Sequence, residues 1–158
     1  MNMKSYEQLM LQNQLCFPLY ACARQIVNRY TPYLKPLGLT YTQYIVMMVL
    51  WEKDGITVGE IGKKLFLDNG TLTPLLKKME AQGHIKRRRS KEDARSITVK
   101  PTKEGKELRE LVQGIPAQVS RCVCINQDEL ESIYGILYKM LEDFANDERW
   151  DGDECEAE

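Results

Sequence analysis

No stretch of the 158-residue sequence is apolar enough to cross a bilayer, since the longest apolar run, residues 45–51, is far shorter than a membrane-spanning helix. Residues 1–14 include charged and amide side chains and no unbroken apolar core, so we expect no secretory signal. The five cysteines are an odd number, and Cys22 lies a whole domain's length before Cys122, which argues against a disulfide framework. We therefore expect a cytoplasmic protein whose thiols are reduced at rest.

Metal-ligating side chains are also scarce. His84 is the only histidine, and no histidine or further cysteine lies near Cys122 and Cys124 in the sequence to complete four ligands. We therefore expect no metal and no cofactor. Because His84 follows a predicted helix end, a structural cap is more typical of it than a ligand or a base.

The chain has little net charge, because 22 Lys and Arg residues face 23 Asp and Glu residues, for a formal charge of −1. That balance by itself argues against a nucleic-acid partner. The charges are segregated, however: residues 77–95 carry eight cations and three acids, whereas residues 142–158 carry nine acids and one cation. Without this acidic end the chain carries +7, so the basic block and the acidic tail need separate explanations.

The length favours a single domain, which we place at residues 1–145, followed by an acidic tail over residues 146–158 that we expect to be disordered. Helical patterns dominate the domain. The first covers residues 15–31 and ends at Pro32, Pro36 and Gly38. Thr40 with Gln43, and Thr57 with Glu60, form two capping boxes; the first opens a core helix, and the second a short helix to about residue 65.

A turn at residues 68–70 then leads to a helix over residues 71–82, which Gly83 stops. The period changes to that of strands over residues 85–89 and 96–100, joined by a charged tip at residues 90–95. Thr102 reopens helix, interrupted at Gly114 and Pro116, and a last helix runs from the cap at Asn126 to about residue 144. The fold class is therefore mainly α with a small β-hairpin wing, a winged helix-turn-helix.

The basic block falls on the second helix of this unit and on the wing. A charge run alone is more often a solvated surface than a binding site. Here, however, the cations occupy the end of that second helix, which is the recognition helix of a helix-turn-helix, and the hairpin. In winged-helix complexes these two elements lie against phosphates and a minor groove. Their position therefore favours double-stranded DNA as a partner.

Four stretches of the chain carry a family resemblance: residues 15–17 (LCF), 39–41 (LTY), 67–77 (LDNGTLTPLLK) and 92–95 (EDAR). With them the sequence resembles the MarR family of winged-helix repressors over about residues 10–145, and most of all its organic-hydroperoxide-sensing branch, including the related staphylococcal-type thiol regulators. The resemblance implies a homodimer whose interface is formed by the first and last helices. Each subunit then presents one winged helix to a palindromic operator.

The candidate DNA contacts lie on the recognition helix and the wing. The helix offers short polar groups at its N-terminus and two lysines further on, and the wing offers cations around a pattern, Asp93 and Arg95, that matches the family's Asp-x-Arg. Arginine suits a narrow, negative minor groove, and Asp93 can hold its guanidinium; a surface ion pair is the alternative interpretation. The full set is Asn69, Thr71, Thr73, Lys77, Lys78, Arg88, Arg89, Lys91, Asp93 and Arg95.

Cys16 lies in an apolar setting, where an inert buried thiol is the usual interpretation. The resemblance reverses that interpretation, because Cys16 matches the branch's peroxide-reactive thiol, and Tyr30 and Tyr41 match the donors that support its thiolate. Fourteen residues separate Cys16 from Tyr30, which is about 21 Å along one straight helix. Tyr30, and Tyr41 with it, must then reach Cys16 from the other subunit unless the helix breaks. Pro18 either starts this helix near Cys16 or kinks it.

A sulfenic acid formed on Cys16 needs a partner thiol to be trapped reversibly. The resemblance places the resolving cysteine of two-cysteine members in the late helical region, where Cys122 is our first choice and Cys124 the second. On a helix these two point about 200° apart, so only one can face a given partner. We expect Cys22 and Cys155 to be bystanders.

The favoured function is a transcriptional repressor, not an enzyme, that is switched by oxidation of Cys16 by an organic hydroperoxide or a related oxidant. One alternative is a repressor of the same fold released by a small aromatic ligand, with Cys16 merely buried. A thiol peroxidase ranks last, because a basic wing and a recognition helix have no place in such an enzyme.

Overall fold

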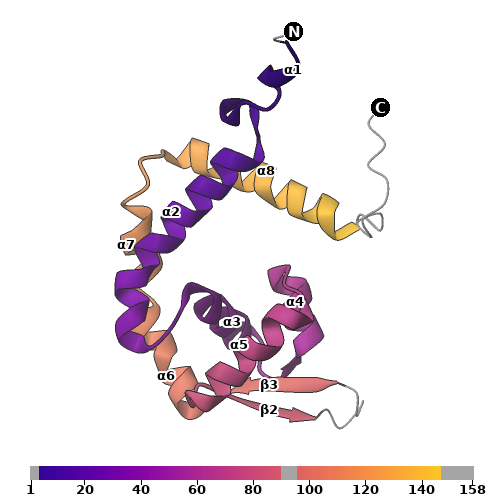
Figure 1. The fold of residues 1–158 in the computed structure, drawn as a ribbon. Coiled ribbons are helices and arrows are strands. Elements are labelled where there is room, and N and C mark those ends of the chain that lie inside the picture. The colour runs from indigo at the N-terminus through magenta and orange to yellow at the C-terminus, as the bar shows by residue number, and fades with distance from the viewer. Residues whose placement is uncertain (1–3, 90–95, 147–158) are drawn as a thin grey trace. The chain divides into compact units, whose positions relative to one another are not determined.

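The computed structural model describes residues 4–89 and 96–146 of the chain, which form helices and one small sheet (Figure 1). It divides into two compact units, residues 1–121 and residues 122–158, and each is described by itself. The helix-rich architecture with a hairpin wing confirms the predicted fold class. None of the described helices is long and apolar enough to cross a membrane.

The first unit opens with α1 (Lys4–Glu7), a 3-10 turn η1 (Leu11–Asn13) and the long helix α2 (Cys16–Leu34). The predicted end of α2 at Pro32 is wrong, because the helix includes that proline and continues to Leu34. In the last turn Pro32 removes only its own bond to the carbonyl of Asn28, and the chain then tightens into η2 (Lys35–Leu37). Gly38 ends this segment in the left-handed conformation, at φ +71°.

Helix α3 (Tyr41–Glu52) is the central element of the first unit. Thr40 and Gln43 form the predicted capping box, with each side chain bonded to the other residue's backbone N–H. Val46, Met47 and Leu50 are at most 1% exposed, so α3 is the core helix that its apolar sequence predicts. They pack with apolar residues of the following helices and strands into one cluster.

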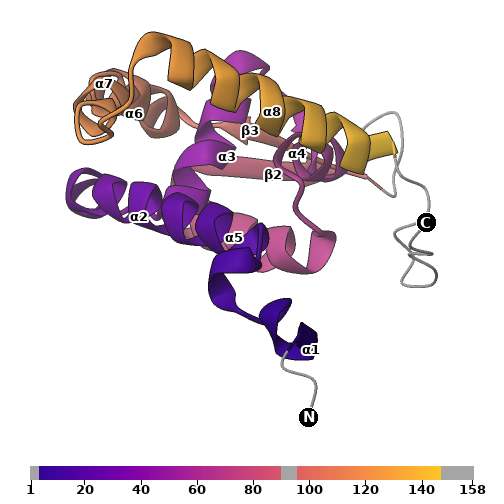
Figure 2. The same ribbon diagram turned by 90° about the horizontal axis from the view of Figure 1, so that it is seen from above.

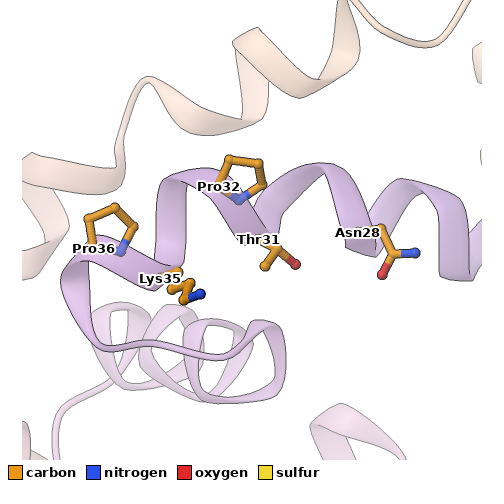
Figure 3. Close-up of a pocket in the computed structure, with 5 residues that line it drawn as sticks. All are labelled: Asn28, Thr31, Pro32, Lys35 and Pro36. Carbon is orange, nitrogen blue, oxygen red and sulfur yellow. The ribbon is translucent and has the colours of Figure 1, made fainter.

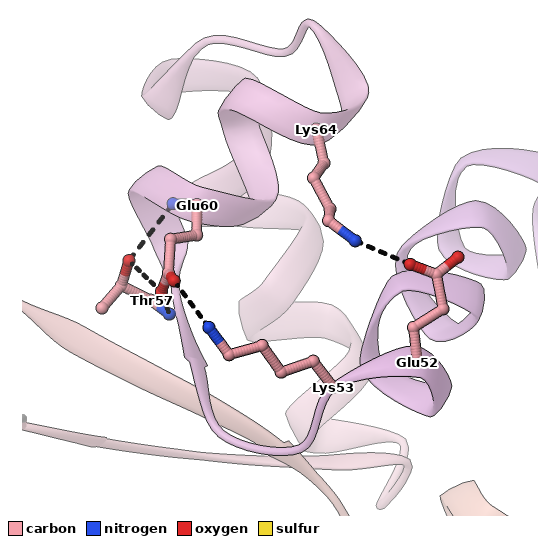
Figure 4. A network of polar contacts seen from close by, with 5 residues as sticks. All are labelled: Glu52, Lys53, Thr57, Glu60 and Lys64. Carbon is pink, nitrogen blue, oxygen red and sulfur yellow. Dashed lines mark hydrogen bonds and ion pairs between the residues drawn. The ribbon is translucent and has the colours of Figure 1, made fainter.

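The helix-turn-helix consists of α4 (Val58–Leu65) and α5 (Asn69–Ala81). Figure 4 shows the second predicted capping box, in which Thr57 and Glu60 cap α4, and two lysines that tie its polar side to the end of α3. The predicted turn at residues 68–70 is wrong, because Asn69 and Gly70 already belong to α5. Asp68 supplies the cap, since its carboxylate accepts the backbone N–H of Thr71 at 2.8 Å.

The wing consists of β2 (Ile85–Arg89) and β3 (Ile97–Pro101), within one residue of the predicted strands. A two-residue strand that the sequence does not reveal, β1 (Ile56–Thr57), pairs antiparallel with β3, so the sheet order is β1-β3-β2. In the wing register Arg87 pairs with Val99. Because side chains alternate across a strand, Arg87 lies on the core side of β2 and Arg88 on the outer side.

Helices α6 (Lys103–Val112) and α7 (Ile115–Ser120) complete the first unit. Leu108, Val112, Ile115 and Val119 pack in a second apolar cluster with the end of α2 and the start of α3. This cluster includes the buried ring of Tyr44 and has Tyr30 and Tyr41 packed against it. The tyrosines therefore lie where α2, α3, α6 and α7 contribute to one core.

The second unit contains α8 (Gln127–Asn146), which begins at the predicted cap: Asn126 and Glu129 bond each other's backbone N–H through their side chains. None of the twenty residues of α8 is buried, and its exposed aromatic side chains include Tyr134, Tyr138 and Phe144. An amphipathic helix with this much exposed apolar surface is typical of an element that packs against another surface.

Candidate nucleic-acid interface and cysteine sites

The N-terminus of α5 is fixed by Asp68 and Thr71. Both the backbone N–H and the hydroxyl of Thr71 donate to the Asp68 carboxylate, at 2.8 and 2.7 Å. The pKa of Asp68 is lowered, because these Thr71 bonds, first the hydroxyl and then the N–H, stabilise the charged form. The first turn of α5 is therefore held in one conformation.

All five predicted contacts on α5 are exposed, whereas Leu72, Leu76 and Met79 of the same helix are buried. The two threonine hydroxyls already donate within the protein, since Thr73 donates to the carbonyl of Asn69 at 2.7 Å and Thr71 to Asp68. Toward DNA, these hydroxyls can therefore act as hydrogen-bond acceptors, and the threonine methyl groups can make apolar contacts. Asn69 adds an amide that can donate and accept, and Lys77 and Lys78 add two cations.

The predicted wing contacts are described only in part. Arg88 and Arg89 are exposed on β2 and, as neighbours in a strand, point to opposite faces of the sheet. Lys91, Asp93 and Arg95 fall on residues 90–95, which lie outside the described residues.

Sequence reasoning missed the role of Arg87 and Glu80. The carboxylate of Glu80 accepts the backbone N–H of Arg87 at 2.8 Å and two of its guanidinium nitrogens at 2.9 and 2.7 Å. The pKa of Glu80 is lowered, first by the backbone bond and then by the guanidinium. Glu80 is the only acid among residues 77–89, and a single acid within a basic segment is the sequence feature that could have indicated an ion pair there.

The end of α5 is capped by backbone groups rather than by the His84 imidazole. Gly83 adopts φ +82°, its N–H donates to the carbonyl of Glu80, and the N–H of His84 donates to that of Met79. Among the described residues neither ring nitrogen of His84 has a hydrogen-bond partner, and burial lowers the pKa of the ring. The predicted cap therefore belongs to the backbone of His84.

Cys16 is the first residue of α2, and its side chain is exposed. Of the two roles predicted for Pro18, the structure shows the first: the helix starts at Cys16, and Pro18 lies in the first turn, where a proline leaves no carbonyl without a donor. The free backbone N–H groups at the start of a helix stabilise negative charge nearby. The thiol therefore lies at the positive end of a 19-residue helix.

The structure brings Tyr30 and Tyr41 together, with ring centroids 5.1 Å apart, and adds Tyr44, at 5.7 and 6.2 Å from them. Burial raises the pKa of Tyr41, and burial followed by the two neighbouring phenols raises that of Tyr44. Figure 2 shows α2 as one unbroken helix, so the roughly 21 Å rise between Cys16 and Tyr30 applies within the chain. The thiol and the tyrosine pair therefore do not meet in one subunit.

The prediction that Cys122 and Cys124 lie on a helix is wrong. They lie in the connection after α7, which ends at Ser120, and before α8, which begins at Gln127. The helical angle of 200° between them therefore does not apply. Both side chains are exposed, as is that of Cys22 on α2, whereas Cys155 lies outside the described residues.

An open hollow of about 720 Å³ lies on the surface of α2 and η2, lined by Asn28, Thr31, Pro32, Lys35 and Pro36 (Figure 3). All five lining residues come from one stretch of nine residues. A small-molecule site is usually enclosed by several elements, with convergent polar groups. This hollow therefore gives no support to a ligand-released mechanism.

The chain is similar to known transcriptional regulators along most of its length. The family model of the SarA/Rot transcriptional regulators matches residues 29–112. The organic hydroperoxide resistance transcriptional regulator of Bacillus subtilis (strain 168) is 42% identical over 137 residues, which cover 87% of this chain and 93% of that protein. Two solved structures are also similar. Reduced AbfR bound to DNA is 38% identical with a TM-score of 0.72, covering 91% of this chain and 99% of that one. Disulfide-formed AbfR is 34% identical with a TM-score of 0.62, covering 89% and 96%.

Proposed function

Because the chain belongs to the MarR/SarA family of winged-helix transcriptional regulators, we propose that it is a DNA-binding repressor that leaves its operator when Cys16 is oxidised. One observation carries the proposal: the same chain has an exposed thiol, that of Cys16, at the first position of a long helix and a winged helix with exposed lysine and arginine side chains. The relatives are regulators of transcription, which supports a regulator acting in the cytoplasm rather than a peroxidase.

In the reduced state a homodimer holds a palindromic duplex, with α5 of each subunit in a major groove and each wing along the neighbouring minor groove. Lys77 and Lys78 contact phosphates, while Asn69, Thr71 and Thr73 meet base edges or phosphates at the helix N-terminus. From the wing, Arg88, Arg89 and Lys91 contribute cations, and Arg95, held by Asp93, enters the narrow groove. The structure of a reduced relative bound to DNA supports this state.

The chemical step begins with the Cys16 thiolate, which attacks the distal oxygen of an organic hydroperoxide. The O–O bond breaks, the sulfur is oxidised to a sulfenic acid, and the peroxide leaves as an alkoxide that takes a proton and becomes an alcohol. The partner subunit's Tyr30 and Tyr41 donate to the thiolate, because Tyr30 of the same chain lies about 21 Å further along α2 and Tyr41, on α3, packs against that Tyr30. The sensor is therefore a property of the dimer.

The test uses a palindromic duplex selected by the protein from a random pool, labelled and followed by fluorescence anisotropy. Wild type is expected to release the duplex on addition of cumene hydroperoxide and to rebind after dithiothreitol. Cys16→Ser is expected to bind and to ignore the oxidant, since serine forms neither a thiolate nor a sulfenic acid. Cys22→Ser is the matched control, because Cys22 is exposed on the same helix, and this variant should still respond.

Three outcomes contradict the proposal. If oxidised wild type keeps its operator, the switch is wrong. If Cys16→Ser still dissociates on oxidation, another thiol is the sensor. Release by salicylate without any oxidant points to the ligand-released repressor instead.

A further inference from the structure

Gln43 is the one polar residue in the buried core of the described chain, with no exposed surface. Its side-chain carbonyl accepts the backbone N–H of Thr40 at 2.9 Å, as part of the capping box of α3. Its Nε2 group donates to the side-chain carbonyl of Gln82, also at 2.9 Å. The cap of α3 is therefore connected to a residue 39 positions further along the chain.

Gln82 is the C-cap residue of α5, the recognition helix. Its Nε2 group donates to the backbone carbonyl of Gly38 at 2.9 Å, so both ends of its amide are engaged. Two glutamine amides thus connect the last turn of α5 to residues 38–43 by hydrogen bonds. We call Gln43 and Gln82 the amide relay.

Residues 38–43, to which the amide relay is hydrogen-bonded, include one of the tyrosines assigned to the sensor. Tyr41 lies between Thr40 and Gln43, and its ring packs against that of Tyr30 with centroids 5.1 Å apart. The Gln43 amide is buried, so leaving it without its partner costs free energy, whereas the bond from Gln82 to Gly38 is exposed to water. The relay therefore resists separation chiefly through the bond between Gln43 and Gln82. Any displacement of residues 38–43 is therefore passed to α5 or breaks these bonds.

The same turn of α5 is also attached to the wing. Glu80, two residues before Gln82, holds the backbone and guanidinium of Arg87 on β2. One polar link thus joins this turn to the tyrosine segment and another joins it to the second DNA-contacting element. The last turn of α5 is the place where both links meet.

We propose that Gln43 and Gln82 are positioning residues that transmit the state of the sensor to the recognition helix. This inference rests on the proposed function, in which Tyr41 supports the Cys16 thiolate. Oxidation removes the negative charge that the tyrosines hold, the segment 38–43 relaxes, and the amide relay displaces α5 from its position on the operator. Neither glutamine touches the thiol or the DNA in this mechanism.

The test compares the release ratio, defined as the operator Kd of the oxidised protein divided by that of the reduced protein. Gln82→Met keeps the length of an exposed side chain and removes both hydrogen bonds. We expect its release ratio to fall at least tenfold below that of wild type, while the rate of Cys16 sulfenic acid formation, followed by mass spectrometry, stays the same. Gln82→Glu keeps the acceptor for Gln43 and removes the donor to Gly38, so it distinguishes the contributions of the two bonds to the release ratio.

Glu80→Gln is the matched control, because it perturbs the same turn but not the amide relay. It is expected to weaken operator binding in both redox states by the same factor, leaving the release ratio at the wild-type value. A Gln82→Met protein that is folded by circular dichroism and has the wild-type release ratio overturns the proposal. An oxidised wild type that keeps its operator overturns the proposed function itself, so the wild-type arm distinguishes the two failures.

Discussion

Arg87 is bound by Glu80 through three hydrogen bonds, so the first of three consecutive arginines on the wing strand is committed to the protein itself. Its side chain is 20% exposed, whereas Arg88 and Arg89 face solvent. Consecutive like charges in a sequence therefore need not form a single charged surface in the folded protein. The pairing with α5 fixes the start of the wing, and on this strand the two exposed arginines, Arg88 and Arg89, are available for phosphates.

Salt dependence of operator binding is expected to separate these arginines. Arg88→Ala should weaken binding and reduce the slope of log K against log salt by about 0.9 for each phosphate that is no longer neutralised. Arg87→Ala should weaken binding by displacing the wing while leaving the slope unchanged, because Arg87 neutralises Glu80 rather than a phosphate. Anisotropy titrations from low to moderate KCl measure both slopes, and a reduced slope in Arg87→Ala would contradict its assignment.

Acid stability of the first unit is expected to depend on Glu60. Bonds first from the Thr57 backbone, then from its hydroxyl and from Lys53, lower the pKa of Glu60 to about 2. Because the folded-state pKa is depressed, the stabilisation is complete above the unfolded-state value near 4.5 and disappears as the pH falls through about 2. NMR titration should show the pKa of Glu60 moving toward its ordinary value in Thr57→Val. The control, Thr98→Val, should leave that pKa near 2.

The backbone of α6 at Gly105 lies very close to that of His84, just before the wing. A methyl group added at Gly105 is therefore expected to lower the free energy of unfolding strongly. A Cβ at Gly105 would lie 2.0 Å from the carbonyl oxygen of His84, a backbone atom that cannot move without its strand. Gly105→Ala should therefore lower the free energy of unfolding by about 3 kcal/mol or more. Gly59→Ala on α4 meets nothing within 4 Å and should stabilise by about 0.5 kcal/mol. Urea denaturation measures both changes.

Local patterns account for what the sequence predicted of the fold. Thr40 with Gln43, and Thr57 with Glu60, are three residues apart, so each capping box can be recognised without knowing the tertiary structure. The cap at Asp68 was missed because an Asn-Gly pair that follows it is also typical of a turn.

The contacts that organise the site have no such local signature. The bond from Gln43 to Gln82 joins residues 39 apart, and that from Trp51 to the carbonyl of Gly105 joins residues 54 apart. The two-residue strand β1 exists only because β3 lies beside it. The roles of Cys16, Tyr30 and Tyr41 came from the family resemblance and stay predictions.

The last prediction concerns the thiol that resolves the oxidised sensor. We predict that a sulfenic acid on Cys16 condenses with the thiol of the partner's Cys122, forming an S–S bond and releasing water, so that no further oxidant is needed. Cys122 is exposed in the connection before α8, so its thiol is accessible for this step. Such a bond joins two chains and shifts the recognition helices from the spacing of about 34 Å that successive major grooves require.

Oxidised wild type is therefore expected to run as a covalent dimer on a non-reducing gel, and Cys122→Ser as a monomer. Cys124→Ser is the control, since Cys124 is exposed in the same connection, and it should still cross-link. Cross-linking that persists in Cys122→Ser but disappears in Cys124→Ser would assign the resolving role to Cys124, because in a connection without helical periodicity either thiol can face the partner. A wild type that never cross-links but releases DNA would leave an external small thiol to complete the switch on Cys16.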